Sequence, residues 1–80
     1  MATIVSKQDY IKKCIGIASD IIKLPFEHLW VDYDKGADVL YLSFRRPQRA
    51  TKTIETDDGI LIRKDGNKIV GITILDASCR

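Results

Sequence analysis

The spacing of hydrophobic residues changes once along the chain, at Pro25, and this change predicts a helix followed by strands. Before Pro25, apolar residues recur at intervals of three, four and seven, which is typical of one wide stripe on an amphipathic helix. Ser6 followed by Asp9 resembles a helix N-cap with an acidic residue in the first turn. Pro25 ends the helix because its ring disfavours helical geometry at the preceding residue. The predicted stripe consists of Tyr10, Ile11, Cys14, Ile15, Ile17, Ala18, Ile21 and Ile22.

After Pro25, apolar and polar residues alternate, which is typical of strands. Turn signals at residues 34–38, at 57–59 and at 64–67 separate these stretches, and Pro47 marks a loop. Gly71, inside the last stretch, marks a bulge or a close approach of backbone. Short connections between neighbouring strands predict an antiparallel meander. The pattern predicts five strands near residues 29–33, 38–44, 51–55, 60–63 and 69–75.

The sequence therefore predicts an α+β fold, in which an N-terminal helix precedes an antiparallel β-meander of four to five strands. A chain of 80 residues is too short for a second core, so residues 1–80 form one domain, with the helical segment in 1–25 and the meander in 28–80. We expect the helix to pack on one face of the sheet, because neither element can bury its apolar side alone.

Alternation places apolar residues on both faces of the second and fifth predicted strands. One helix covers only one face, so a second subunit is the economical cover for the other, and we expect a homodimer. The first face contains Leu40, Leu42, Phe44, Val70, Ile72 and Ile74, and the second contains Val39, Tyr41, Ile69, Thr73 and Leu75.

Composition excludes several classes of protein. Hydrophobic residues make up 45% of the chain and charged residues 30%, which is globular rather than disordered composition. No apolar run approaches the length of a membrane-spanning helix, and residues 1–6 do not resemble a signal peptide, so we expect a cytoplasmic protein without membrane association. Two cysteines and one histidine, widely spaced, make neither a disulfide framework nor a zinc site. We expect two reduced thiols, no metal and no cofactor.

A basic loop is the strongest candidate for ligand binding. Its guanidinium groups can clamp phosphates, and Tyr41 or Trp30 can offer a stacking face. The net charge of +2 gives no independent support for nucleic-acid binding, and a charged loop is ordinarily only solvated. The candidate nucleic-acid residues are Arg45, Arg46, Arg49 and Lys52.

A protein interface is the other candidate site. Trp30 is a single large aromatic on an alternating strand and can anchor a partner, or it can simply pack against the helix or its linker. Strand residues from the two predicted apolar faces belong to the same candidate interface. The candidate interface residues are Trp30, Leu40, Tyr41, Leu42 and Phe44.

No catalytic constellation is visible in the sequence. The acidic turns can be read as a hard-cation or acid/base site, or as ordinary turn residues whose side chains bind nearby amides. His28 has no nucleophile close to it in sequence, and the chain has no phosphate-binding glycine loop. The acidic turn residues are Asp34, Asp38, Asp57, Asp58 and Asp76.

From Val31 to its C-terminus, the chain resembles a prokaryotic family of short proteins, the domain-of-unknown-function family twenty-two eighty-three (DUF2283). The likeness rests on Tyr33-Asp34, on 37–42 with Phe44, on 57–60, on Asp65 with 68–72, and on 74–78. The resemblance implies a compact β-rich domain and no particular reaction. It also implies an accessory or antitoxin-like role, because some members look like small partner proteins encoded beside compact toxins. The helical N-terminal segment and the basic loop depart from the family pattern.

Three hypotheses about function follow. The first is a non-enzymatic protein-binding module, supported by the small size and the surplus of apolar strand surface. The second is a nucleic-acid-binding protein that uses the basic loop at 45–52. The third is a small enzyme, for which the sequence names no catalytic residue.

Overall fold

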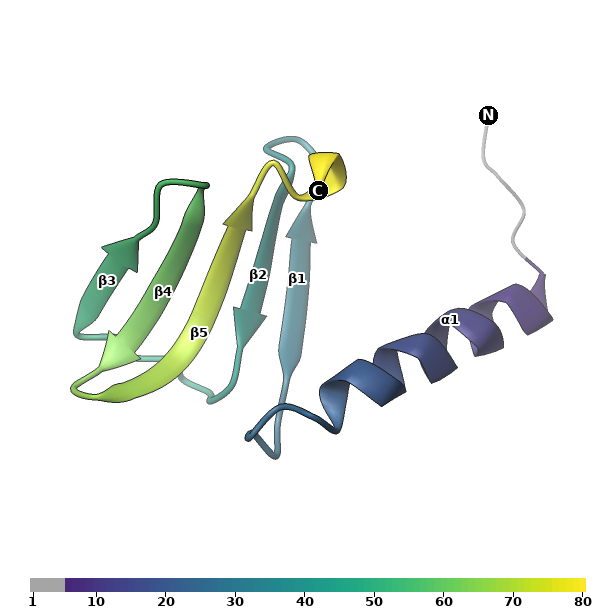
Figure 1. The fold of residues 1–80 in the computed structure, drawn as a ribbon, viewed down its shortest axis with the longest axis horizontal. Coiled ribbons are helices and arrows are strands. Elements are labelled where there is room, and N and C mark those ends of the chain that lie inside the picture. The colour runs from purple at the N-terminus through teal and green to yellow at the C-terminus, as the bar shows by residue number, and fades with distance from the viewer. Residues whose placement is uncertain (1–5) are drawn as a thin grey trace.

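The computed structural model describes residues 6–80 and shows one helix followed by a five-stranded antiparallel sheet (Figure 1). The predicted α+β class is confirmed. Residues 1–5, which include the start of the predicted helical segment and most of the stretch considered as a leader, lie outside the described residues. The elements are α1 (Lys7–Ile21), β1 (Trp30–Asp34), β2 (Val39–Ser43), β3 (Lys52–Glu55), β4 (Ile60–Asp65), β5 (Lys68–Leu75) and the 3₁₀ helix η1 (Ala77–Cys79).

Helix α1 begins as the sequence predicts. The Ser6 hydroxyl oxygen accepts a hydrogen bond of 3.2 Å from the Asp9 amide, so it satisfies one of the free N–H groups of the first turn. The helix ends at Ile21, and the Ile22 amide donates to the Ala18 carbonyl at 3.1 Å. Pro25 follows within four residues, as expected for a residue that cannot continue a helix.

The strand order in the sheet is β1-β2-β5-β4-β3, so the predicted simple meander is wrong. Strands β3, β4 and β5 do form consecutive hairpins, and β1 and β2 form another. However, β5 pairs with β2 as well as with β4, which places the last strand in the centre and β3 at an edge. Short connections predict which neighbours form hairpins, but they do not predict how two sets of hairpins join.

The turns use residues with positive φ, as tight hairpins require. Gly66, with φ of 63°, turns the chain between β4 and β5, and Gly59, with φ of 82°, precedes β4. In the turn between β1 and β2 the left-handed residue is Asp38, with φ of 55°, rather than Gly36.

Gly71 marks both a register irregularity and a close approach. The pairing of β4 with β5 shifts between Arg63, opposite Gly71, and Lys64, opposite Ile69, so Val70 is the extra residue. Because of this extra residue, side chains of β5 do not alternate simply between the two faces here, as the prediction that Ile69 and Val70 lie on opposite faces assumed. A Cβ on Gly71 would lie 2.9 Å from the Leu42 carbonyl oxygen and would meet the Gln48 side chain. Gly71 therefore leaves room for the Gln48 side chain.

Few side chains of the described residues are buried. The buried hydrophobic residues are Val39, Phe44 and Val70, and Thr73 is a buried polar residue. Phe44 packs against Phe26 of the linker, with parallel rings whose centroids are 3.9 Å apart. This contact fixes the linker at the end of β2.

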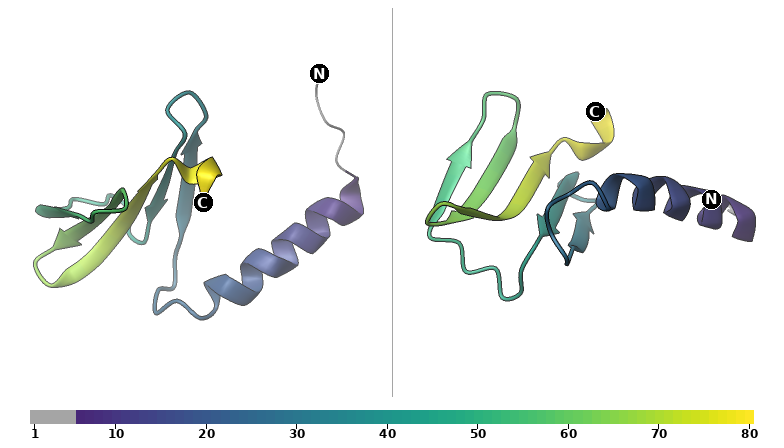
Figure 2. Two further views of the ribbon diagram at one scale, coloured as in Figure 1. Left: turned by 45° about the horizontal axis from the view of Figure 1, so that its top comes forward. Right: turned by 60° about the horizontal axis from the view of Figure 1, so that its bottom comes forward.

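Helix α1 does not pack on the sheet, which corrects the expectation from the sequence. The helix leaves the linker past the edge strand β1 and stands clear of both faces (Figures 1 and 2). None of its residues is buried. The amphipathic pattern shows that a helix needs a cover, but it does not identify that cover. Within residues 6–80, no helix is both long and apolar enough to cross a membrane.

Candidate functional site

One face of the sheet carries only apolar side chains over most of its area. Because residues directly opposite each other in antiparallel strands point to the same side, the register defines this face. One row crosses all five strands, and a second row crosses four of them. We call this set the apolar face; it consists of Val31, Leu42, Ile72, Ile62 and Ile54 in the first row and Tyr33, Leu40, Ile74 and Ile60 in the second.

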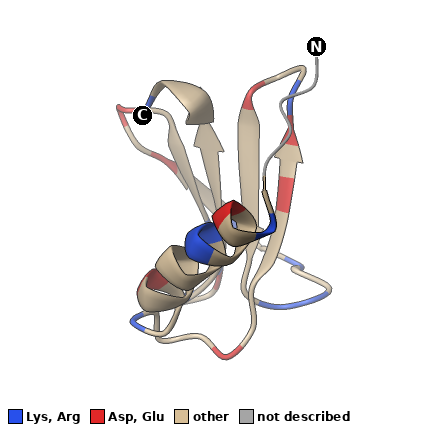
Figure 3. Cartoon of the chain, turned by 90° about the vertical axis from the view of Figure 1, so that its right-hand side faces the viewer, with Lys and Arg blue, Asp and Glu red and all other residues tan. Residues whose placement is uncertain are grey.

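The apolar face is open to solvent in this chain. None of its nine side chains is buried, and Val31 keeps 55% and Tyr33 45% of their surface exposed. Figure 3 shows that Lys, Arg, Asp and Glu gather mainly on the helix, the turns and the loops, and leave most of the strand length uncharged. An apolar surface of this extent on a small monomer is a common mark of an interaction site.

The stripe on α1 is equally open. Its exposed fractions are 64% for Ile15 and 80% for Ile22, and Tyr10 keeps 59%. A helix rich in β-branched isoleucine is not stable in water without packing, because most helical stability in proteins comes from a docked apolar face. Within residues 6–80, the chain thus presents two apolar surfaces that no other described element covers.

The other face of the sheet is mixed in character. The row through Trp30 continues with Ser43, Gly71, Arg63 and Thr53. The next row contains Asp32, Tyr41, Thr73, Leu61 and Glu55. We call these two rows the mixed face.

The residues predicted as a protein interface are divided between these surfaces. Leu40 and Leu42 lie on the apolar face, whereas Trp30 and Tyr41 lie on the mixed face. Phe44 is 8% exposed and is covered by Phe26, so it contributes to the small core.

Trp30 lies between a histidine and an arginine. The His28 ring stacks beside it at a centroid distance of 5.6 Å, and the Arg46 guanidinium lies 5.9 Å from the centre of the indole ring. This distance is within the range of a cation–π contact. The linker and the loop after β2 thus meet at Trp30, in a cluster that combines aromatic surface with positive charge.

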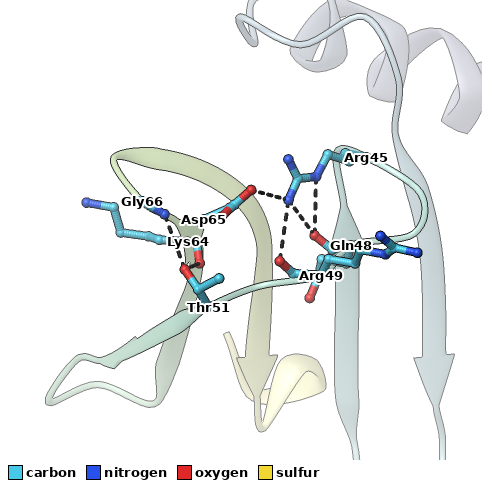
Figure 4. A network of polar contacts seen from close by, with 7 residues as sticks. All are labelled: Arg45, Gln48, Arg49, Thr51, Lys64, Asp65 and Gly66. Carbon is cyan, nitrogen blue, oxygen red and sulfur yellow. Dashed lines mark hydrogen bonds and ion pairs between the residues drawn. The ribbon is translucent and has the colours of Figure 1, made fainter.

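Arg45, by contrast, is engaged within the protein (Figure 4). Its guanidinium donates to the Gln48 carbonyl at 2.9 Å and pairs with the Asp65 carboxylate at 2.8 Å. The same group lies 3.4 Å from the Arg49 carbonyl oxygen. These contacts join the loop at 44–51 to the β4–β5 hairpin, so Arg45 closes a turn instead of presenting its charge to a ligand.

The remaining residues of the predicted phosphate clamp do not converge with Arg45. Arg46 turns to Trp30, Arg49 is exposed with φ of 46°, and Lys52 lies in β3 opposite Lys64. Near this point Thr51 is tied to the hairpin, since its hydroxyl oxygen accepts a hydrogen bond of 3.3 Å from the Gly66 amide (Figure 4). The Thr51 amide also donates to the Lys64 carbonyl at 2.8 Å. The structure thus brings Arg46 into an aromatic cluster and leaves Arg49 and Lys52 exposed.

A recess of about 300 Å³ lies beneath the linker, next to the bulge. It is lined by apolar and by charged or polar residues: Pro25, Phe26, Phe44, Ile69 and Val70, and Glu27, His28, Arg45 and Lys68. Glu27 is acidic and Arg45 and Lys68 are basic, so the lining carries charges of both signs.

Asp38 organises the end of the sheet where β1, β2 and η1 meet. Its carboxylate accepts hydrogen bonds from the Tyr33 hydroxyl at 2.6 Å and from the Ser78 hydroxyl at 2.7 Å. The Ser78 amide donates to it as well, at 3.0 Å. The bonds from Tyr33 and Ser78 hold the pKa of Asp38 below its ordinary value. The hydrogen bond to Asp38, partial removal from water and the negative charge of that carboxylate raise the pKa of Tyr33.

The other acidic turn residues also serve their own turns. Asp34 accepts a hydrogen bond of 3.2 Å from the Ala37 amide, and Asp58 accepts one from the Thr56 hydroxyl, which lowers the pKa of Asp58. Asp76 adopts φ of 51° before η1. Within residues 6–80, no group of three or more His, Cys, Asp or Glu side chains is arranged to hold a metal ion. Cys14 and Cys79 are free and exposed.

Sequence reasoning found part of the apolar face and missed the rest. It placed Leu40, Leu42, Ile72 and Ile74 together correctly, but it did not extend the face to β1, β3 and β4. The missing signal was available, because the alternation of Ile60 and Ile62 and the hairpin turn at Gly66 fix the register of β4 against β5. The missed residues are Val31, Tyr33, Ile54, Ile60 and Ile62.

Comparison with known proteins gives a match to a protein family. A family model described as a protein of unknown function (DUF2283) matches residues 30–78, which include all five strands and most of η1. No curated protein and no solved structure matches the chain. Helix α1 lies outside the matched range.

Proposed function

The chain belongs to the DUF2283 family of proteins of unknown function, and from this premise we propose that it is a non-enzymatic protein-interaction module that self-associates through its apolar face. The observation that carries the proposal is the imbalance between this face and the core. Nine apolar side chains lie together on one side of the sheet, whereas three hydrophobic residues of the described chain are buried. Small domains with little core of their own commonly gain stability by oligomerisation.

The surface area supports the same proposal. The chain exposes 6538 Å², whereas a compact monomer of this mass exposes roughly 4,900 Å². The difference, roughly 1,600 Å² per chain, is about twice the area that one partner contributes to an interface of standard size, which is roughly 800 Å². Association that covers the apolar face would remove part of this excess exposed area.

The polar contacts favour binding over catalysis. The side chains of Asp38, Asp58 and Arg45 form hydrogen bonds within the turns and loops around them. We place the association in the cytoplasm, where exposed thiols such as Cys14 and Cys79 stay reduced.

Multi-angle light scattering after size-exclusion chromatography tests the proposal. We expect the protein at tens of micromolar to have a mass above the 9.1 kDa of one chain, and the mass to fall on dilution. Ile62→Glu, which puts a charge on the apolar face between Ile72 and Ile54, should give the mass of one chain. Thr53→Glu puts the same charge on the mixed face and should leave the mass unchanged. A single-chain mass for the unmodified protein would overturn the proposal.

A second candidate function is nucleic-acid binding, which the contact between Arg46 and Trp30 favours. An arginine beside an aromatic ring is a frequent element of single-strand recognition, and Arg49 and Lys52 are exposed on the same loop and the strand after it. The discriminating variant replaces Arg46, Arg49 and Lys52 with alanine and keeps Arg45, whose ion pair with Asp65 is part of the fold. Fluorescence anisotropy with a labelled single-stranded oligonucleotide should show salt-sensitive binding that this variant loses. Equal anisotropy for the two proteins would reject this candidate.

A further inference from the structure

The apolar stripe of α1 and the apolar face of the sheet match each other in size and chemistry. A helix of 15 residues is about 22 Å long. Five strands span about 19 Å from edge to edge. The stripe contains five aliphatic or aromatic residues with large exposed areas, and the face contains nine apolar residues in two rows. Each surface is therefore large enough to cover much of the other.

The position of α1 sets its stripe apart from the sheet of its own chain. Phe26 is held flat against Phe44, which fixes the point from which the helix departs. From that point α1 extends outward past β1, away from both faces (Figure 2). In this arrangement the helix of one chain is free to contact a second chain, whose apolar face is uncovered.

We propose that α1 of one chain docks on the apolar face of a second copy, and that the second copy returns the same contact about a twofold axis. This proposal rests on the proposed self-association and names the element that covers the apolar face. A reciprocal exchange of this kind is isologous, so it closes at two chains and leaves neither apolar surface free. Each chain then buries both of its apolar surfaces, so the exchange covers more of the excess exposed area than covering the apolar face alone would.

Two variants with opposite charges test the exchange. Ile15→Lys puts a positive charge in the helix stripe, and Ile62→Glu puts a negative charge on the apolar face between Ile72 and Ile54. In a dimer of either variant with itself, both contacts would place a charged group against an apolar surface. Each variant alone should therefore have the mass of one chain by light scattering. Mixed in equal amounts, the two variants can form one contact in which the charges pair and one contact that is entirely native. The mixture should therefore recover the mass of two chains.

The controls use the polar side of each element. Lys13→Glu lies on the polar side of α1 and Thr53→Glu lies on the mixed face, and both should keep the mass of two chains. Ile15→Lys leaves the sheet untouched, because no residue of α1 is buried. If Ile62→Glu does not fold, as judged by circular dichroism, Ile54→Glu on the edge strand β3 replaces it.

The outcomes separate this proposal from the one it rests on. If the unmodified protein has the mass of two chains and the mixture does not recover it, the chains associate without exchanging α1, and only the helix exchange is overturned. If the two single variants stay dimeric, the exchange is overturned as well. If the unmodified protein has the mass of one chain, both proposals fail, and the helix has another cover, such as its own sheet or a different protein.

Discussion

The Tyr33 hydroxyl donates a hydrogen bond of 2.6 Å to the Asp38 carboxylate, and the same carboxylate holds the hydroxyl and the amide of Ser78. Through this one carboxylate, a residue of β1 and a residue of η1, which follows β5, are joined at the end of the sheet. All three residues belong to the segments on which the likeness to the DUF2283 family rests. Asp38 also adopts a left-handed backbone conformation, so its side chain and its backbone both shape the turn between β1 and β2.

Tyr33 should titrate above the ordinary pH range of a tyrosine. The hydrogen bond to Asp38 and the negative charge of that carboxylate raise the pKa of Tyr33 above the ordinary value of about 10. Stability from this contact is fully present below that ordinary value and is lost as the pH rises through the folded pKa. Ultraviolet titration of tyrosinate should show a late component that Tyr33→Phe removes and Asp38→Asn moves to lower pH. A late component that persists in Tyr33→Phe would contradict the assignment.

Asp38 should contribute to the acid sensitivity of the fold. Its pKa is lowered by the bonds from Tyr33 and Ser78, whereas an aspartate in an unfolded chain has a pKa of about 3.9. Its contribution is therefore present above about pH 4 and is lost as the pH falls through the folded pKa. Urea midpoints measured at about pH 6 and about pH 3 should differ less for Asp38→Asn than for the unmodified protein. If the urea midpoints at the two pH values differ by the same amount in both proteins, Asp38 does not contribute to the acid sensitivity of the fold.

Gly71→Ala should destabilise the protein, and Gly16→Ala should stabilise it. At Gly71 a methyl group meets the Leu42 carbonyl oxygen and the Gln48 side chain, so we expect a loss of about 1–3 kcal/mol in the free energy of unfolding, as for overpacking. At Gly16, inside α1, a methyl group meets no atom within 4 Å, and replacing a helix glycine gains about 0.5–1 kcal/mol. Urea unfolding measures both changes. If the two substitutions change the free energy of unfolding equally, the close approach at Gly71 does not contribute to stability.

Arg45→Ala should cost more stability than Asp65→Asn. Both side chains of the ion pair are partly exposed, so solvent screening limits the pair itself to about 0–1 kcal/mol. Arg45 also donates to the Gln48 carbonyl, and losing that hydrogen bond adds on the order of 1 kcal/mol. Thermal unfolding of the two variants at low and high salt separates the contributions, because salt weakens only the ion pair. A larger loss for Asp65→Asn would mean that the pair, and not the carbonyl contact, holds the loop.

The local elements of this fold were readable from the sequence. Ser6 and Pro25 delimit α1 by capping and by ring geometry, and Gly59 and Gly66 supply the positive φ that the turns need. Each of these signals acts within a few residues, so each predicts an element with nearly correct bounds.

The assembly of those elements was not readable. The pairing of Val39 with Leu75 joins distant parts of the chain, and no local pattern specifies it. The position of α1 was missed for a related reason, because the stripe at Ile15 predicts burial without identifying the surface that provides it. Arg45 was read as a free phosphate ligand, whereas its partners Gln48 and Asp65 come together only in the folded protein.

The central position of β5 has a consequence for how the protein is made. Synthesis proceeds from the N-terminus, so the β1–β2 and β3–β4 hairpins leave the ribosome before the strand that joins them. Until β5 arrives, each pair exposes a free edge that can capture another strand, and the distant pairing of β2 with β5 is the slow type of contact. The last of the five strands to be translated is thus the one that completes the sheet, and nascent chains pass through a stage that is open to mispairing.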